Sequence, residues 1–503
     1  MSKQTDFSEH INNGYATKGE SIILGGAILD GDALPNTHVK IPLKTLNRHG
    51  LIAGATGTGK TKTIQVLSEQ LSSFGIPVLM MDIKGDFSGI AAKGEEKPFI
   101  TERHAKITLP YEANSFPVEL MTLSAQDGVR MRATVSEFGP VLFSRILDLN
   151  DTQAGVVSVI FKYCDDKKMP LLDLKDVKKL INYITEEGKA EIAADYGKIS
   201  TSTTGIILRK IIELEQQGGD IFFGEKSFEI DDLMRLDENG KGYVNILRLT
   251  DIQDKPKLFS TFMLSLLAEI YQQMPEKGDA DQPELVVFID EAHLIFDQAS
   301  KALLDQIETI IKLIRSKGIG IYFVTQNPMD VPASVLAQLG LKIQHALRAF
   351  TAKDRQAIKQ TADNYPTSDY YKTDEVLTSL GIGEAFVTAL NEKGIPTPLA
   401  ATMMRAPMSR MDVLTETEIL EINAKSKLVK KYAEEIDRES AYEILTKKIE
   451  EANQAAEEVK PIEEKRKSNE PSTAEVIGKS VTKVVTSASF IRGVFGILTK
   501  LFK

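Results

Sequence analysis

Apolar runs alternate with amphipathic stretches over residues 49–120. An apolar run at 49–53 enters a glycine-rich loop, residues 60–71 have helical spacing, and a second apolar run ends at Asp82. Strand, loop, helix and strand in this order predict a βαβ unit, which favours a parallel sheet. Residues 1–48 contain SIILGGAIL and HVKIPL, whose β-branched residues lie between turn-forming residues. We therefore expect a short N-terminal β segment before the first part of an α/β core.

The pattern changes over residues 121–282. Stretches such as AGVVSVIFKYC, LKDVKKLINYI and GIILRKIIELEQQ have helical spacing, which predicts a mostly helical insertion between strands of the sheet. Residues 283–410 return to the α/β pattern, with strands at LVVFID, GIGIYFVTQ and LKIQHALRA and a helix at about 299–316. The predicted fold class is α/β, with a core formed by two parts of the chain.

The C-terminal part of the chain is predicted to be helical. Residues 411–460 are charged and favour a helix, 461–473 have the composition of a flexible linker, and 474–503 carry apolar residues at alternating spacings of four and three. Basic residues lie off this stripe. We expect this last helix to dock on its own assembly through the stripe; the alternative is that it lies on anionic lipid or contacts DNA.

Composition and charge narrow the class of protein. Hydrophobic residues make up 42% of the 503 residues, which is ordinary for globular proteins, and the formal net charge is -10. The acidic balance argues against a protein coated in nucleic acid but allows local contact with DNA, because distant charges are screened beyond about 8 Å at physiological salt. Cys164 is the single cysteine, so an intramolecular disulfide is excluded. The N-terminal residues lack a signal-peptide pattern, and we expect a cytoplasmic protein.

A nucleotide-binding loop is predicted after the first core strand. Residues GATGTGKT fit G-x-x-x-x-G-K-[ST], where glycines let backbone N–H groups surround phosphate oxygens and the helix N-terminus adds positive charge. The alternative, a glycine-rich turn that contains Lys-Thr by chance, does not explain the strand–loop–helix context. Lys60 would reach the β- and γ-phosphates, and the Thr61 hydroxyl would bind Mg²⁺. The predicted nucleotide-binding residues are Gly54, Ala55, Thr56, Gly57, Thr58, Gly59, Lys60, Thr61 and Lys62.

A second stretch, LVVFIDEAH, has the features of a Walker B strand. Asp290 follows the apolar run and would hold Mg²⁺, and Glu291 is placed to polarise the attacking water, so ATP and Mg²⁺ are the predicted cofactors. The alternative is a strand end with two solvated acids. Gln326, at the end of a later strand, is a candidate γ-phosphate sensor or a surface amide. Asp82 is a weaker candidate for the floor of the site.

Two arginines are candidates for the arginine finger of phosphoryl transfer. Arg315 precedes a predicted strand and Arg348 follows another, and either is expected to point across a subunit boundary. The alternative for each is a cation at a helix end or on the surface.

These motifs resemble the HerA-like branch of the HerA/FtsK ATPases, and specifically its bacterial HerA-like group. The likeness runs through NRHGLIAGATGTGKT, DIKGDFSGIA, FGPVLFSRILDLNDTQAGV, FIDEAHLIFDQA, IRSKGIGIYFVTQNPMDVP and QLGLKIQHALRAFTAKD. The resemblance implies a RecA-like P-loop NTPase core, assembly into a ring that is usually a hexamer, ATP between subunits, and double-stranded DNA in the pore. By this resemblance, Lys60 and Thr61 would bind phosphate and Mg²⁺. Asp290 and Glu291 would form the Walker B motif, and Gln326 would be the sensor residue.

Three functions follow from these features. The first is a DNA translocase, for which Lys84, Arg103 and Lys106 are candidate DNA contacts, although each fits a solvated surface charge at least as well. The second is an ATPase that remodels or scaffolds a protein partner. The third, a metabolic kinase, leaves Glu291 and Gln326 without a purpose.

Overall fold

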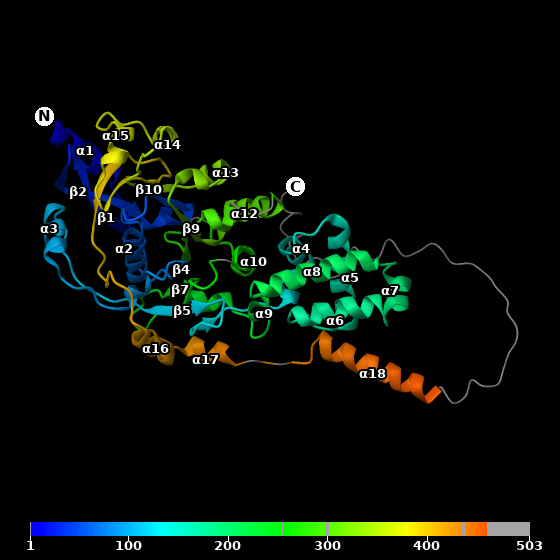
Figure 1. The fold of residues 1–503 in the computed structure, drawn as a ribbon. Coiled ribbons are helices and arrows are strands. Elements are labelled where there is room, and N and C mark those ends of the chain that lie inside the picture. The colour runs from blue at the N-terminus through cyan, green and yellow to red at the C-terminus, as the bar shows by residue number, and fades with distance from the viewer. Residues whose placement is uncertain are drawn as a thin grey trace. The chain divides into compact units, whose positions relative to one another are not determined.

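A computed structural model describes residues 2–253, 255–278, 280–296, 301–434, 436 and 438–459. The chain divides into two compact units (Figure 1). Unit 1 consists of the residues up to Arg130, Glu229–Pro256 and Leu266–Ala433, and unit 2 of Met131–Phe228, Lys257–Ser265 and the described residues after 433. The predicted linker at 461–473 and helix at 474–503 lie outside the described residues.

Unit 1 contains a sheet of 12 strands. Across the sheet the strands lie in the order β2 (Asp32–Pro42), β1 (Ser21–Leu29), β12 (Ala400–Met404), β11 (Glu384–Thr388), β10 (Leu341–His345), β3 (Gly50–Ala53), β9 (Ile319–Thr325), β8 (Leu285–Ile289), β4 (Val78–Asp82), β7 (Val244–Arg248), β5 (Val118–Thr122) and β6 (Val129–Arg130). From β10 to β6 all neighbours are parallel, and from β2 to β10 all are antiparallel.

The parallel strands form the core and position the site. Every residue of β3, β4, β8 and β9 is buried, as expected for parallel strands that are covered on both faces. Strand β9 lies between β3 and β8, so one strand separates the glycine-rich loop after β3 from the acidic pair after β8. The carboxyl ends of these strands share one edge of the sheet, where ligands of open parallel sheets bind.

Helices surround the sheet of unit 1 (Figure 1). They are α1 (Lys3–Gly14), α2 (Lys60–Ser73), α3 (Pro98–Lys106), α11 (His293–Phe296), α12 (Lys301–Ile314), α13 (Ala333–Leu336), α14 (Ala352–Asp363), α15 (Thr373–Ser379), α16 (Glu416–Lys425) and α17 (Lys427–Ala433). Short 3-10 helices are η1 (Leu43–Arg48), η2 (Ser88–Ala91), η3 (Ile230–Met234), η4 (Arg315–Lys317) and η5 (Pro328–Asp330). Helix α10 (Pro256–Gln273) has residues in both units.

Unit 2 is helical. Its helices are α4 (Val135–Ile146), α5 (Asp151–Lys167), α6 (Leu174–Thr185), α7 (Lys189–Asp195), α8 (Thr201–Gln216), α9 (Gly219–Phe222) and α18 (Ala441–Val459). Capping boxes at Thr134, Asn150 and Asp173 fix the starts of α4, α5 and α6. In each box the cap side chain accepts a hydrogen bond from the backbone N–H three residues later, and the side chain of that later residue accepts one from the N–H of the cap residue.

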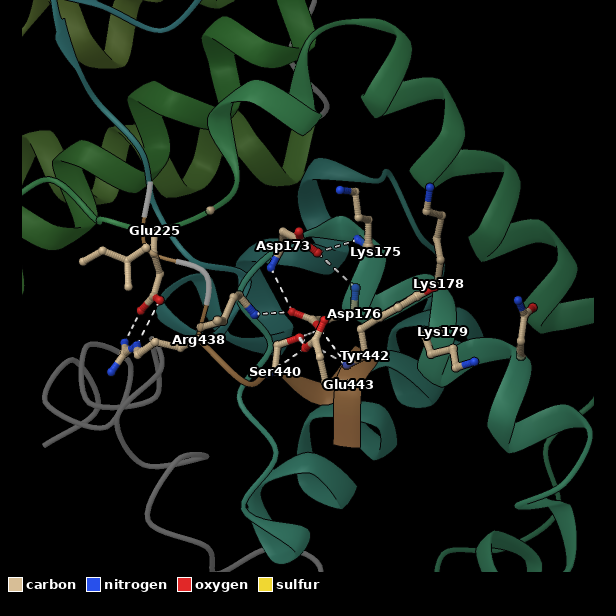
Figure 2. A pocket seen from close by; sticks show the side chains of 14 residues that line it. Asp173, Lys175, Asp176, Lys178, Lys179, Glu225, Arg438, Ser440, Tyr442 and Glu443 are labelled. Carbon is tan, nitrogen blue, oxygen red and sulfur yellow. Dashed lines mark hydrogen bonds and ion pairs between the residues drawn. The ribbon is translucent and has the colours of Figure 1, made fainter. Parts of the chain in front are cut away.

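Helix α18 is anchored in unit 2 by a buried carboxylate. Asp176 Oδ1 accepts hydrogen bonds from Ser440 Oγ at 2.5 Å and from the Tyr442 N–H at 2.8 Å, while Oδ2 accepts from the Leu172 N–H at 2.7 Å (Figure 2). A pocket of about 720 Å³ lies beside this anchor and is lined by side chains of both charges.

The helical residues in the range 411–459 are divided between the two units: α16 and α17 belong to unit 1, and α18 belongs to unit 2.

Some elements differ from the sequence-based expectation. Helix α1 lies in the N-terminal segment that was expected to be β, and its Phe7 and Ile11, four residues apart, are buried. Strand β7 lies inside the range 121–282, where a mostly helical insertion is predicted, because the five residues VNILR are too short to distinguish a strand from a buried helix turn. None of the helices in the described part of the chain combines the length and hydropathy needed to cross a bilayer.

A buried histidine joins β3 to its neighbours. The His49 side chain donates from Nε2 to the Ile311 carbonyl at 2.8 Å and accepts at Nδ1 from the Ile321 N–H at 3.1 Å. Because burial opposes the charged ring, the pKa of His49 falls to about 4. The neutral ring therefore supports the amino ends of the core strands, opposite the edge that carries the site.

His49→Asn should cost less stability at low pH than at neutral pH. In the unfolded chain a histidine titrates near 6.5, so the unfolded state binds the proton more readily and the wild type loses stability as pH falls from about 6.5 to 4. Asparagine does not titrate and tolerates the positive φ of 56° at this position. Urea unfolding at pH 7 and 5 should show the penalty of the variant shrink by about 2 kcal/mol. A penalty that does not change with pH would contradict the lowered pKa.

Candidate nucleotide site

The glycine-rich loop lies between β3 and α2 and is fixed by its backbone. The Gly54 N–H donates to Thr325 O at 3.2 Å, and the Ala55 N–H donates to Ala346 O at 2.9 Å. Gly54 and Gly59 have φ values of 152° and 117°, which favour glycine. A Cβ on Gly54 would lie 2.5 Å from the Cβ of His345, so this glycine is also required by close packing.

Lys60 begins α2 and turns back over the loop. Its Nζ donates to the carbonyl oxygens of Gly54 at 2.7 Å and Ala55 at 3.2 Å. Burial, followed by the charge of Lys84, lowers its pKa. The ammonium group thus lies at the loop that the sequence predicts for phosphate.

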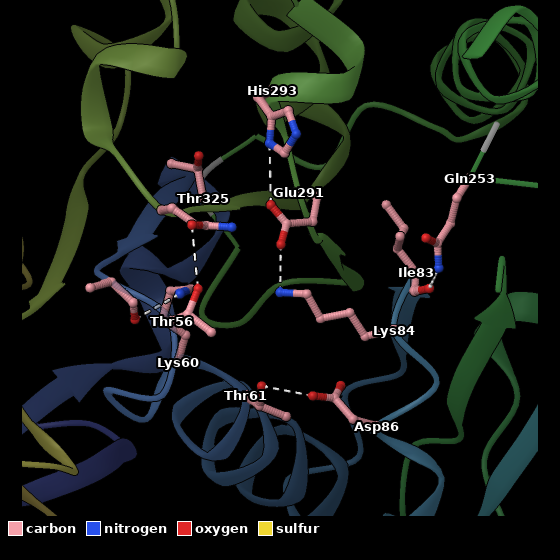
Figure 3. Close-up of polar contacts among 12 residues, drawn as sticks. Thr56, Lys60, Thr61, Ile83, Lys84, Asp86, Gln253, Glu291, His293 and Thr325 are labelled. Atoms are coloured by element: carbon pink, nitrogen blue, oxygen red, sulfur yellow. Dashed lines mark hydrogen bonds and ion pairs between the residues drawn. The ribbon is translucent and has the colours of Figure 1, made fainter. Parts of the chain in front are cut away.

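Thr61, the next residue, contacts an acid that the sequence analysis did not select. Its Oγ1 donates to Asp86 Oδ2 at 3.1 Å (Figure 3). The other oxygen, Asp86 Oδ1, is buried and makes no hydrogen bond in the described structure. A hydroxyl and a carboxylate with an unsatisfied oxygen form a donor set that suits a hard divalent cation.

The acidic pair follows β8 at the same edge of the sheet. Asp290 and Glu291 are both buried, and burial raises the pKa of Asp290 to about 6. Glu291 Oε1 lies 2.5 Å from Lys84 Nζ, and Oε2 lies 3.2 Å from His293 Nδ1 (Figure 3). Burial acts to raise the pKa of Glu291, but the hydrogen bond and charge of Lys84 outweigh it and hold the pKa below its usual range.

Asp82 shapes the floor of the site. Its carboxylate accepts hydrogen bonds from the backbone N–H groups of Gly85 at 2.7 Å, Asp86 at 3.1 Å and Phe87 at 3.4 Å. Burial, together with the charge of Asp86, raises its pKa to about 7. Asp82 therefore acts through the turn that presents Lys84 and Asp86.

Gln326 reaches the loop from the strand between the two motifs. It follows β9, and its Oε1 accepts a hydrogen bond from Thr56 Oγ1 at 3.3 Å. The structure thus brings together the side chains of Thr56, Lys60, Thr61, Asp290, Glu291 and Gln326 with the backbone of the glycine-rich loop.

Other predicted residues lie elsewhere. Lys62 donates to the Met411 carbonyl and to Gln65 Oε1, so its side chain points away from the loop, and nucleotide binding by Lys62 stays a prediction. Because Arg315 precedes β9, it lies at the edge of the sheet opposite the glycine-rich loop. Arg348 follows β10 at the same edge as the loop, is exposed, and donates to the Thr378 carbonyl at 3.2 Å.

Two of the three candidate DNA contacts have internal partners. Lys84 pairs with Glu291, and Arg103 donates to the carbonyls of Ile382, Gly383 and Met404 at 2.9 to 3.1 Å. Arg103 lies on α3 and reaches carbonyls in the loop before β11 and at the end of β12. Lys106 is exposed.

Fold and site together define a P-loop NTPase with an α/β core, in which a buried acidic pair follows β8 at the sheet edge that carries the glycine-rich loop. The chain belongs to the helicase HerA-like family: the family model described as Helicase HerA-like C-terminal matches residues 28–494.

Known helicases match about 70% of this chain at low identity. The DNA double-strand break repair helicase HerA of Sulfolobus acidocaldarius is 20% identical over 380 residues, which cover 75% of this chain and 69% of the relative. The HerA helicase of Saccharolobus solfataricus is 22% identical over 371 residues, with 70% and 64% covered. The probable helicase MJ1565 of Methanocaldococcus jannaschii is 25% identical over 350 residues, with 68% and 60% covered. The chain thus spans 60 to 69% of the length of these relatives.

The solved structures of a plasmid coupling protein share the fold. Unbound TrwB superposes with a TM-score of 0.52 at 14% identity, covering 81% of this chain and 94% of that one. TrwB in complex with the ATP analogue ADPNP also has a TM-score of 0.52 at 14% identity, covering 82% and 95%.

Proposed function

We propose that the chain assembles into a ring, hexameric by family resemblance, that hydrolyses ATP and uses the energy to translocate double-stranded DNA. The observation that carries this proposal is the buried Glu291 at the end of β8, on the same sheet edge as Lys60. A site that only bound nucleotide would not need a second acid beside the Mg²⁺ ligand. The family relatives named as DNA repair helicases support DNA as the track.

ATP with Mg²⁺ is the proposed cofactor pair. Thr61, Asp86 and Asp290 would hold the ion, and the unsatisfied Asp86 Oδ1 fits this role because a cation would satisfy it. When bound, Mg²⁺ neutralises charge on the phosphate oxygens. Asp86 lies in the loop after β4, and Asp290 directly follows β8, the neighbouring strand.

The side chains divide the chemistry between them. Lys60 would exchange its loop carbonyls for phosphate oxygens, which are stronger acceptors. Glu291 would orient the attacking water and accept its proton, and Gln326, already at the loop, would report the γ-phosphate through Thr56.

The arginine finger is proposed to come from a neighbouring subunit. Arg348 is the better placed of the two candidates, because it is exposed at the edge that carries the glycine-rich loop. Arg315 lies at the opposite edge and would need a different face of the neighbour.

Mixing two inactive variants tests the arginine. Arg348→Ala and Lys60→Ala should each be inactive alone, but an equal mixture should recover activity at about a quarter of its interfaces, where the intact loop of one subunit meets the intact arginine of the other. Arg315→Ala in the same mixture tests the second candidate. An Arg348→Ala protein that keeps full ATPase activity alone would remove this residue from the mechanism.

A further inference from the structure

Lys84 lies beside the carboxylate that performs the proposed chemistry. Strands β4 and β8 are parallel neighbours, with Met81 opposite Ile289, so the residues that follow them emerge side by side. Lys84 extends from the loop after β4 towards Glu291, and the two charged groups meet at 2.5 Å (Figure 3). Topology, rather than chain proximity, therefore creates this pair.

The backbone around Lys84 is held on both sides. After it, three N–H groups are bound by the Asp82 carboxylate. Before it, the Ile83 carbonyl accepts a hydrogen bond from Gln253 Nε2 at 2.6 Å. A lysine on a fixed turn delivers its ammonium group to a defined place, although its stem is flexible.

Glu291 needs such a partner. Its side chain is 8% exposed, whereas that of Lys84 is 42% exposed, so the carboxylate is the buried member of the pair. Burying a carboxylate without a partner is strongly unfavourable. The backbone of Glu291 has a φ of 47°, a conformation that L residues rarely adopt. This backbone conformation sets the direction in which the Glu291 side chain leaves the chain.

We propose that Lys84 is a positioning residue for hydrolysis: it holds Glu291 Oε1 and thereby sets the direction in which the carboxylate faces the attacking water. The inference rests on the proposed ATPase function. It differs from a DNA contact, for which Lys84 was a candidate by sequence, and from a second phosphate ligand beside Lys60.

The test compares Lys84→Met and Lys84→Arg with wild type in kcat, in the affinity for a non-hydrolysable ATP analogue, and in DNA affinity at fixed salt. Lys393→Met, the loss of an exposed lysine in the turn between β11 and β12, is the matched control. Lys84→Met should lower kcat by about 10- to 100-fold, because a small misplacement of a catalytic group has an effect of this size. Analogue and DNA affinities should stay within about twofold, and Lys84→Arg should recover part of kcat.

Three results would overturn the proposal. An analogue affinity that falls as far as in Lys60→Ala makes Lys84 a phosphate ligand, a DNA affinity that falls with unchanged kcat makes it a DNA contact, and an unchanged kcat leaves it no role in hydrolysis. Thermal unfolding adds a check on folding: Lys84→Met should lower the melting temperature, and Lys84→Met combined with Glu291→Gln should restore it, since the buried charge is then removed as well. If Glu291→Gln alone kept full hydrolysis, the proposed function of Glu291 would fail instead.

Discussion

Glu291→Gln should abolish steady-state ATP hydrolysis while nucleotide binding persists. The glutamine has the size and nearly the hydrogen-bonding shape of the glutamate but cannot accept a proton from water, and removing a general base of this kind lowers rates by about 10²- to 10⁴-fold. Its buried position between Lys84 and His293 excludes bulk water as a substitute. Phosphate release measures the rate, and a fluorescent ATP analogue measures the affinity.

The control for this variant is Glu102→Gln, the same change on the exposed surface of α3, which should behave as wild type. Loss of hydrolysis together with loss of analogue binding would indicate a damaged site rather than a missing base. Retained hydrolysis would assign the base to another residue.

Lys60→Ala should remove both nucleotide binding and hydrolysis. Lys60 is proposed to donate charge-assisted hydrogen bonds to phosphate, each worth about 1.5 to 3 kcal/mol, so affinity should fall at least about tenfold and the rate further. The fold should survive, since Lys60 contacts only the carbonyls of its own loop in the described structure.

The neighbouring lysine provides the matched control. Lys62 belongs to the same helix turn, but its side chain binds the Met411 carbonyl and Gln65, away from the loop. Lys62→Ala should therefore keep analogue affinity within about twofold of wild type, which is a smaller change than the loss of one hydrogen bond to a charged group would cause. Equal losses in the two variants would mean that net positive charge, and not the geometry of the loop, binds the nucleotide.

Much of the core is predictable because its signals are local. Strand β1 and the strands that end at Asp82 and Ile289 are mostly apolar runs between turn residues. The glycine pattern of the loop after β3 is by itself enough to predict the conformation of that loop. The family resemblance adds the pairing of the two Walker motifs. For this reason the sequence alone predicts both halves of the candidate nucleotide site, although more than two hundred residues separate them.

The remaining site residues depend on which strands become neighbours. Lys84 meets Glu291 only because β4 lies next to β8, and Asp86 meets Thr61 only because the turn bound by Asp82 folds towards α2. Neither pairing has a sequence spacing that reveals it. Only the motif DIKGD, which contains both Lys84 and Asp86, points to this part of the chain. His345, buried against Thr63 and beneath Gly54, follows from the pairing of β10 with β3.

Three elements at the antiparallel side, β11, β12 and α1, were not predicted. Strands β11 and β12 are five residues each, too short for alternation to stand out, and they are fixed by pairing with β10 and β1. Helix α1 has few apolar residues, and its place is set by the contact of Phe7 and Ile11 with the core. Tertiary contacts, rather than local preference, decide these segments.

The most direct test of the central claim is the steady-state ATPase rate of the purified protein without DNA, with linear double-stranded DNA and with single-stranded DNA. Salt is held fixed because DNA affinity depends steeply on it, and Lys60→Ala and Glu291→Gln serve as inactive controls. A DNA-coupled motor predicts stimulation by double-stranded DNA that both variants lose. If both variants lose hydrolysis but no DNA changes the wild-type rate, the ATP site stands and DNA as the track is contradicted. The search would then turn to a protein partner.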